Sequence, residues 1–515
     1  MASLVYLKNK KNNVTYVYEN TSVWDKEKKK CRCSRKCIGH KDTGTGEIVH
    51  NERRTKEIVP VKPAAHVTSV GNALIYDRIC SSIALTSVLK KAFPDDWTQI
   101  LTCAYYLIGE GKALSHCGTW SAAHKNPYGG ELTGQRISEL LTRLTRDKQM
   151  DFFKLWVKQR LEKEYIAMDI TSVSSYSKQN EYVRYGYNRD GEDLPQINLC
   201  MLLGEESRIP LFYELLPGSI HDVSTLKSVL KKAEWMGASG IHAVMDKGFC
   251  SEANIDSMYE SAMHFMIGMS FVSKYAKDCV AKAKEDITHH NNYRCISGDD
   301  IFVKSWCDNW KGHRLYVHVY YDSEKADAEY KKFLKELEQC RLELLSGQKE
   351  KKHEAWYKDC FIVKETPVRG IKISYRDDAI DRYRNNTAGY FVLVSNDIKD
   401  PVDALKIYRC KDEIEKSFDD LKNTLDCRRL RIQSESAMQG RLFIQFIALI
   451  IMNKMRSFID GTELYRNNTL PEIINEMSTL HEVTVSDRHG CIYSPLSKLQ
   501  SEILKAFAID IAPYV

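Results

Sequence analysis

Residues 408–422 read "YRCKDEIEKSFDDLK", a charged stretch with the spacing of an α-helix. Tyr408, Glu415 and Lys422 recur every seven residues, and Lys411 lies between the first two. At about 100° per residue these four side chains share roughly 60° of arc. The apolar residues directly alongside are Ile407, Ile414, Phe418, Leu421 and Leu425. The spacing therefore predicts one helix with a phenol, two ammonium groups and a carboxylate along the rim of its buried face. Glu413 differs from Glu415 by about 200° around the axis and points away.

Two apolar runs upstream each lead into an aspartate. "YIAMD" (165–169) ends at Asp169, and "IHAVMD" (241–246) ends at Asp246. Taken singly, each would more often be a cap or turn residue. Together they suggest a site, because α/β proteins place ligands at the ends of sheet strands. Paired carboxylates without a His or Cys cluster favour Mg²⁺ or Mn²⁺ over zinc.

Further short apolar runs bounded by turns predict an α/β fold built on a mixed sheet. A chain of 515 residues should also hold more than one domain. The expected divisions are a β-rich basic N-terminal region (1–65), a helical candidate DNA-binding module (66–162), the first part of the core (163–270), an insertion subdomain (271–385), the second part of the core (386–460) and a C-terminal helical tail (461–515).

The composition fits a soluble protein of a reducing compartment. Charged residues make up 28% of the chain, and the net charge of +6 permits a nucleic-acid partner without demonstrating one. The 16 cysteines are scattered singly, unlike those of a disulfide scaffold. The start of the chain lacks the apolar segment of a secretory signal. The apolar run 442–452 is too short to cross a bilayer and predicts a buried helix. We therefore expect a cytoplasmic protein.

The N-terminal region contains "KEKKKCRCSRKCIGH" (26–40). Cys31, Cys33, Cys37 and His40 lack the paired C-x2-C spacing of structural zinc sites, so chance placement in a basic segment is favoured over zinc. The seven Lys and Arg residues between Lys26 and Lys36 indicate either a solvated hairpin or a loop that contacts phosphates.

The helical region 66–162 has an apolar stripe at Ile137, Leu141 and Leu144, while its arginines lie elsewhere around the helices. These arginines are Arg136, Arg143 and Arg146. A solvated basic face and a DNA-binding face both explain this pattern.

The ordered set of motifs resembles the DDE transposases of bacterial insertion sequences, in the branch with a Tyr-Arg-Glu-Lys signature. "DITS" (169–172) is similar to the family's first aspartate segment, "MDKGF" (245–249) to its second, and the opening stretch to its third. "GRLFIQFIALII" (440–451) and the segment 14–49 also resemble regions of these proteins. Lys411 stands where the family often has Arg, which keeps the charge but loses bidentate phosphate contact. Arg441 stands where His is expected.

The resemblance implies a ribonuclease-H-like core in which Asp169, Asp246 and Glu415 hold two Mg²⁺ (or Mn²⁺) ions. It also implies that Tyr408, Lys411 and Lys422 contact transposon-end DNA, with a homodimer working on DNA in the prokaryotic nucleoid. A tryptophan of the insertion would stack on a flipped base, and the sequence leaves Trp306, Trp310 and Trp356 open.

The function expected from the resemblance is metal-dependent cleavage at transposon ends, followed by strand transfer of the 3′-OH into target DNA. Two alternatives remain. One is a ribonuclease-H-like DNA nuclease or resolvase, which cleaves without strand transfer. The other is a catalytically silent DNA-binding descendant of a transposase, which would be expected to have lost a carboxylate.

Overall fold

The computed structural model describes residues 2–25, 30–51, 65–160, 164–178, 180–220, 242–366, 370–409, 411–484, 491–510 and 512–514, with isolated positions between 226 and 232. The chain divides into two compact units. One comprises residues 1–65 with 485–489, and the other comprises the remainder. All the described cysteines are free thiols.

The N-terminal unit is a four-stranded antiparallel sheet of β1 (Ala2–Lys8), β2 (Thr15–Asp25), β3 (Lys30–Lys41) and β4 (Ile48–His50). Cys31 and Cys37 both lie on β3, six residues apart. An extended strand of that length spans about 20 Å, so the two thiols cannot share one metal ion. The expected basic segment falls partly on β3, and Lys26, Lys28 and Lys29 lie outside the described residues.

The second unit is built on a ten-stranded mixed sheet. Its strands β6 (Tyr165–Ser175), β7 (Gln196–Gly204) and β8 (Pro210–Pro217) form an antiparallel meander. β9 (His242–Met245) pairs parallel with β6, and β10 (His264–Gly268) pairs parallel with β9. β7 is buried along its whole length, which explains its nearly unbroken apolar sequence. The expected mixed α/β architecture is present.

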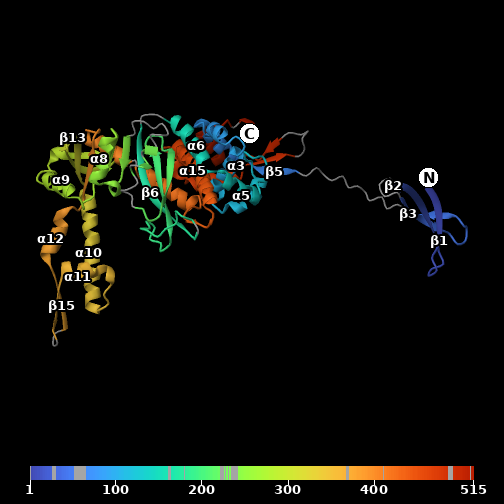
Figure 1. Cartoon of the computed structure of the whole chain (residues 1–515), viewed down its shortest axis with the longest axis horizontal. Coiled ribbons are helices and arrows are strands. Elements are labelled where there is room, and N and C mark those ends of the chain that lie inside the picture. Colours follow the sequence, from blue (N-terminus) through green and yellow to red (C-terminus); the bar gives the residue numbers. More distant parts are fainter. Residues whose placement is uncertain are drawn as a thin grey trace. The chain divides into compact units, whose positions relative to one another are not determined.

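The sheet continues into the segment expected to be an insertion. β16 (Tyr390–Ser395) pairs antiparallel with β10, and β13 (His313–Tyr321), β12 (Asp299–Trp310) and β11 (Tyr293–Ile296) follow in that order. The two-residue strand β17 (Arg429–Leu430) joins β6. The first part of the 271–385 segment therefore belongs to the main sheet. Helices α8 (Glu252–Glu260) and α9 (Lys274–Lys284) lie near these strands in Figure 1.

Residues 323–386 form an arm with an apolar core of its own. The arm consists of α10 (Ser323–Ser346), a 3₁₀ turn at Lys351–His353, α11 (Glu354–Cys360), the β-hairpin of β14 (Phe361–Thr366) and β15 (Gly370–Tyr375), and α12 (Asp377–Asn386). Figure 1 shows α10, α11, α12 and β15 extending away from the sheet.

A helical layer covers the other end of the sheet around α15 (Glu435–Ile459). Figure 1 shows α3, α5 and α6 gathered around α15. The helices of the layer are α1 (Gly71–Ser82), α2 (Leu85–Ala92), α3 (Trp97–Glu110), α4 (Cys117–Ala123), α5 (Gly134–Arg143) and α6 (Arg146–Lys158). By length and composition α15 could span a membrane, but 78% of its most apolar window is buried inside the protein. It is the expected buried helix, longer than the apolar run alone.

Two arginines of the helical region make contacts inside the protein. Arg143 pairs with Asp96 at 2.7 Å, and Arg146 pairs with Glu214 on β8 at 2.9 Å. Arg136 contacts the phenol of Tyr128. These contacts give each arginine a partner within the protein, and the Arg143 side chain remains 41% exposed.

The C-terminal segment combines helices with strands. It contains α16 (Glu463–Asn467), α17 (Leu470–Ser478), β18 (His481–Thr484), β19 (Cys491–Tyr493) and α18 (Lys498–Ala506). β18 pairs antiparallel with β19 and with β5 (His66–Ser69). This segment therefore packs as part of the second unit rather than forming a helical tail.

Candidate active site

The two aspartates emerge side by side from neighbouring parallel strands. Met168 on β6 is paired with Met245 on β9, so Asp169 and Asp246 both follow the same rung of the sheet. Asp169 does not end its strand as predicted. β6 continues to Ser175 because its other edge remains paired with β7. Parallel pairing with β9 stops at Met168, while antiparallel pairing with β7 continues past Asp169. The sequence pattern of one strand does not contain this difference.

The signature stretch is not one continuous α-helix. α13 (Pro401–Arg409) precedes α14 (Lys411–Asp419), with Cys410 outside the described residues, and a π-helix spans Asp420–Thr424. Hydrogen bonds in a π-helix run from residue i to i+5, so each residue turns the chain less than in an α-helix. The rotation of 100° per residue on which the predicted row rests therefore does not hold as far as Lys422.

Tyr408, Lys411 and Glu415 converge on the aspartates. The Tyr408 hydroxyl donates to Asp246 Oδ1 at 2.8 Å. The Lys411 ammonium lies 3.1 Å from the same oxygen and 3.2 Å from Glu415 Oε1. It thus bridges the second and third predicted carboxylates. Glu413 instead pairs with Lys416 at 2.8 Å, on a different side of α14.

A glycine that the sequence analysis did not single out makes room for this arrangement. Gly268 ends β10, and a Cβ atom built there would lie 2.6 Å from the Tyr408 hydroxyl and 3.4 Å from the Lys247 amide. Any larger residue would force the phenol away from Asp246. Only the packed sheet shows this close approach, because Gly268 lies 140 residues before Tyr408 in the chain.

The two aspartates differ in their electrostatic surroundings. Burial raises the pKa of Asp169 to about 6, and the charge of Asp246 acts in the same direction. Burial also acts to raise the pKa of Asp246, but the Lys411 ammonium, the Lys247 amide and the Tyr408 hydroxyl outweigh it and hold that pKa below its usual value. Burial, followed by the charge of Asp246, raises the pKa of Tyr408, so the phenol stays protonated.

The loop between β6 and β7 supplies two further charged groups. The positive charge of Arg189 favours the ionised form of Asp169. Asp190 holds Lys422, whose ammonium lies 2.7 Å away and whose side chain is only 10% exposed. Lys422 therefore forms an ion pair with Asp190, the residue after Arg189, whereas Tyr408 and Lys411 contact Asp246. The sequence "NRDGED" (188–193) resembles any polar turn and gave no signal for these roles.

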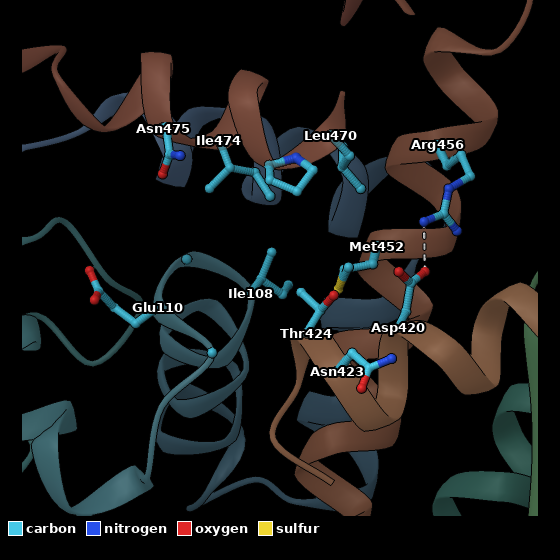
Figure 2. A pocket seen from close by; sticks show the side chains of 13 residues that line it. Ile108, Glu110, Asp420, Asn423, Thr424, Met452, Arg456, Leu470, Ile474 and Asn475 are labelled. Atoms are coloured by element: carbon cyan, nitrogen blue, oxygen red, sulfur yellow. Dashed lines mark ion pairs between the residues drawn. The ribbon is translucent and has the colours of Figure 1, made fainter. Parts of the chain in front are cut away.

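The π-helix is anchored from behind by a buried ion pair. Asp420 and Arg456 on α15 are 2.7 Å apart, and Figure 2 shows them beside a pocket of about 310 Å³. Ile108, Met452, Leu470 and Ile474 form the apolar part of its wall. Gly111, with a φ of +58°, closes α3 against the Thr424 carbonyl, which leaves no room for a Cβ atom. Contacts from α15 and from the end of α3 therefore hold the end of the signature stretch in place.

The three candidate tryptophans have different surroundings. Trp310 is buried and donates its indole N–H to Asp256 at 2.9 Å. Trp306 lies under the Lys282 ammonium, 4.4 Å from its ring centroid. Trp356 lines a hollow of about 860 Å³ together with Lys247, the residue after Asp246. Of the three, Trp356 is the one that lines a hollow next to an aspartate. Arg441 has a structural contact, pairing with Asp426 at 2.6 Å.

The acidic residues fit hard divalent cations, which prefer carboxylate oxygens. Asp169 and Asp246 repel each other electrostatically, and a cation would relieve this repulsion. Lys411 now supplies positive charge between Asp246 and Glu415. Among the described residues, two clusters bring three ligand atoms within 4.8 Å of one another, and the three acidic residues of the candidate site do not form such a cluster. The two clusters are His242 with His264 and Asp397, and Cys340 with Glu343 and His353.

Comparisons with known proteins identify the family. A solved structure of a piggyBac transposase synaptic complex with hairpin DNA is 10% identical, with 78% of this chain and 70% of that chain covered and a TM-score of 0.35. A TM-score this low does not establish a shared fold. No curated protein matches the chain. The family described as the transposase DDE domain matches residues 160–451, more than half of the chain and the whole of the acidic site. The chain therefore belongs to the DDE transposase domain family.

Proposed function

We propose that the protein is a DNA transposase that cleaves at transposon ends and transfers the freed 3′-OH into target DNA. Asp169, Asp246 and Glu415 are its proposed catalytic residues and metal ligands. The observation that carries this proposal is the Lys411 bridge between Asp246 and Glu415, on the rung where Asp169 also emerges. The carboxylates of Asp169, Asp246 and Glu415 are suited to binding divalent cations, which supports phosphodiester chemistry of the kind known for the family.

Two Mg²⁺ or Mn²⁺ ions bound by these carboxylates would supply activation of the attacking hydroxyl and stabilisation of the leaving oxygen. The chain's own residues prepare that step. Tyr408 fixes the position of the Asp246 carboxylate by a 2.8 Å hydrogen bond. The Lys411 ammonium balances the charges of Asp246 and Glu415. Metal binding by these carboxylates would release the ammonium, which could then bind a DNA phosphate.

We further propose a ribonuclease-H-like core, with β6, β7 and β8 as its antiparallel part and β9 and β10 as its parallel part. Tyr408, Lys411 and Lys422 are the proposed contacts to transposon-end DNA. For Lys422 this role requires that its ammonium leave Asp190. A homodimer that brings two transposon ends together is part of the same proposal.

The test is cleavage of a labelled duplex that carries the element's own end. Asp169→Asn keeps the shape of the side chain but removes the charge that holds a cation, so Mg²⁺-dependent nicking should be lost. Asp278→Asn, at an exposed position on α9, is the matched control and should nick normally. Equal nicking by Asp169→Asn and the wild type would rule out the assignment.

Strand transfer separates the proposal from its alternatives. Joined products support a transposase, cleavage without joining supports a nuclease or resolvase, and DNA binding without cleavage supports a silent descendant. Inverted repeats around the reading frame, with short direct repeats outside them, would support mobility independently of any assay.

A further inference from the structure

The arm formed by residues 323–386 is held together by a small amount of apolar packing. Its separate core contains seven buried residues, namely Phe333, Leu337, Cys340, Leu344, Tyr357, Cys360 and Phe361. Modules with a core this small commonly need a disulfide or a structural metal to be stable. The described cysteines of the arm are free thiols, so a disulfide does not stabilise it.

Three side chains of different ligand types meet inside this core. Cys340 and Glu343 are one turn apart on the same face of α10, and His353 directly precedes α11. All three are buried, and one ligand atom from each lies within 4.8 Å of the other two. We propose that Cys340, Glu343 and His353 form a structural zinc site, which nothing in the proposed transposase chemistry requires.

The chemistry of the donors favours zinc over the hard cations of the acidic site. Thiolate, imidazole and carboxylate are the ligands of Zn²⁺, whereas Mg²⁺ takes oxygen ligands. Cys360, at the end of α11, lies in the same core but outside the 4.8 Å cluster, so its thiol would have to move to take a fourth position. The resulting spacing is C-x2-E-x9-H-x6-C, which ties the two helices on either side of the 3₁₀ turn.

The surroundings of His353 match those of a zinc-bound imidazole. Its Nδ1 faces Glu343 Oε2 at 2.8 Å, and its Nε2 lies 3.6 Å from Glu336 Oε2. With Nδ1 on the metal, Nε2 would donate to Glu336, and a metal-bound histidine almost always has such a carboxylate or carbonyl partner. Tyr357 and Gln339 also donate to Glu343 and orient its carboxylate.

The site also has routes of entry. Glu343 lines a surface groove with Gln339, and His353 lines the hollow that contains Lys247 and Trp356. A metal between the two helices would therefore fix the wall of the hollow beside the acidic site. The alternative is a metal-free hydrogen-bond cluster centred on Glu343, and the experiment distinguishes the two.

The test uses the full-length chain, purified, freed of metal with a chelator and titrated with Zn²⁺ and with Co²⁺. We expect one tightly bound zinc ion per chain, and with Co²⁺ a tetrahedral ligand-field spectrum with a thiolate-to-cobalt charge-transfer band. The acidic site has no thiolate, so that band is specific to cysteine ligation. Cys340→Ser and His353→Gln should each lose the bound zinc and the cobalt spectrum.

Two control variants locate the metal. Cys279→Ser removes a buried thiol on α9 outside the arm and should leave the stoichiometry unchanged. Tyr357→Phe removes a hydrogen bond to Glu343 but no ligand. It should retain the cobalt spectrum with affinity lowered by about 10- to 100-fold.

Absence of tight zinc binding to the wild type would overturn the proposal and favour the hydrogen-bond cluster. So would zinc bound equally by the wild type, Cys340→Ser and His353→Gln, which would indicate adventitious binding at other thiols. Because the wild-type measurement alone is decisive, a variant that fails to fold does not leave the question open.

Discussion

The two halves of the 408–422 stretch are both rich in charged residues but have different surroundings. In the first half, Tyr408, Lys411 and Glu415 face the acidic site, and Lys411 bridges two carboxylates. In the second half, Lys422 lies in an ion pair with Asp190 and is largely buried. The regular α-helix ends between the halves, at Asp419. A repeat of seven residues places side chains on one face only while the helix remains regular.

The π-helix has an identifiable tertiary support. Asp420 is tied to Arg456 on α15, and the Thr424 carbonyl abuts Gly111 at the end of α3. The first half of the stretch would therefore govern chemistry, and the second half would govern how firmly this region is held. The following predictions test that division.

The largest effect is expected at Glu415. Glu415→Gln removes a proposed metal ligand and should lower nicking and strand transfer by roughly a thousand-fold, since a bound metal contributes several kcal/mol. Binding to end-containing DNA should persist. Glu413→Gln, two residues away but paired with Lys416, should behave nearly as wild type. If Glu413→Gln were inactive and Glu415→Gln active, Glu415 would have to be rejected as the third metal ligand.

At Lys422 the expected effect is on stability. Lys422→Ala leaves the half-buried Asp190 without its partner and should lower the free energy of unfolding by up to about 3 kcal/mol. Chemical denaturation measures this loss, and Lys416→Ala at a 58% exposed position is the control. The salt dependence of DNA binding should be measured in the same variants. A shallower slope for Lys422→Ala would support the proposed phosphate contact, whereas an unchanged slope with lowered stability would show that Lys422 forms a structural ion pair only.

An intermediate effect is expected at Gly268. Gly268→Ala places a Cβ atom 2.6 Å from the Tyr408 hydroxyl, and overpacking of this kind costs about 1–3 kcal/mol. Thermal unfolding and the nicking rate should both decline. Gly109→Ala, on α3 with no atom within 4 Å of the new Cβ, should leave stability unchanged or raise it by up to about 1 kcal/mol. Equal behaviour of the two variants would contradict the close approach.

The smallest effect is the pH dependence of cation binding. Because burial raises the pKa of Asp169 to about 6, its carboxyl is neutral below that pH and ionised above it. Cations bind the ionised form, so the affinity for Mn²⁺ should fall by about tenfold per pH unit below pH 6 and level off above it. Calorimetric titration measures this affinity, with Asp278→Asn as the control. An affinity that stays constant through pH 6 would contradict the assigned role of Asp169.

The sequence by itself determined the parts of the site that depend on local periodicity. Apolar runs predicted the strands that carry Asp169 and Asp246, and the helical spacing separated Glu415 from Glu413. The apolar runs follow from burial of a central strand on both faces, and the separation of the two glutamates follows from the helical repeat of 3.6 residues. The family resemblance rested on the same motifs together with segment 14–49, and the transposase DDE domain match at residues 160–451 covers the motifs but not that segment.

The tertiary structure decided what local periodicity does not contain. Pairing with β7 carries β6 past Asp169, and the close packing of β10 requires glycine at position 268. The partners of Lys422 and Asp420 come from residues 190 and 456, which no local pattern connects to the signature stretch. Contacts between distant segments depend on how the sheet and helices pack together, so only the folded chain shows which charged residues face the site and which hold the structure.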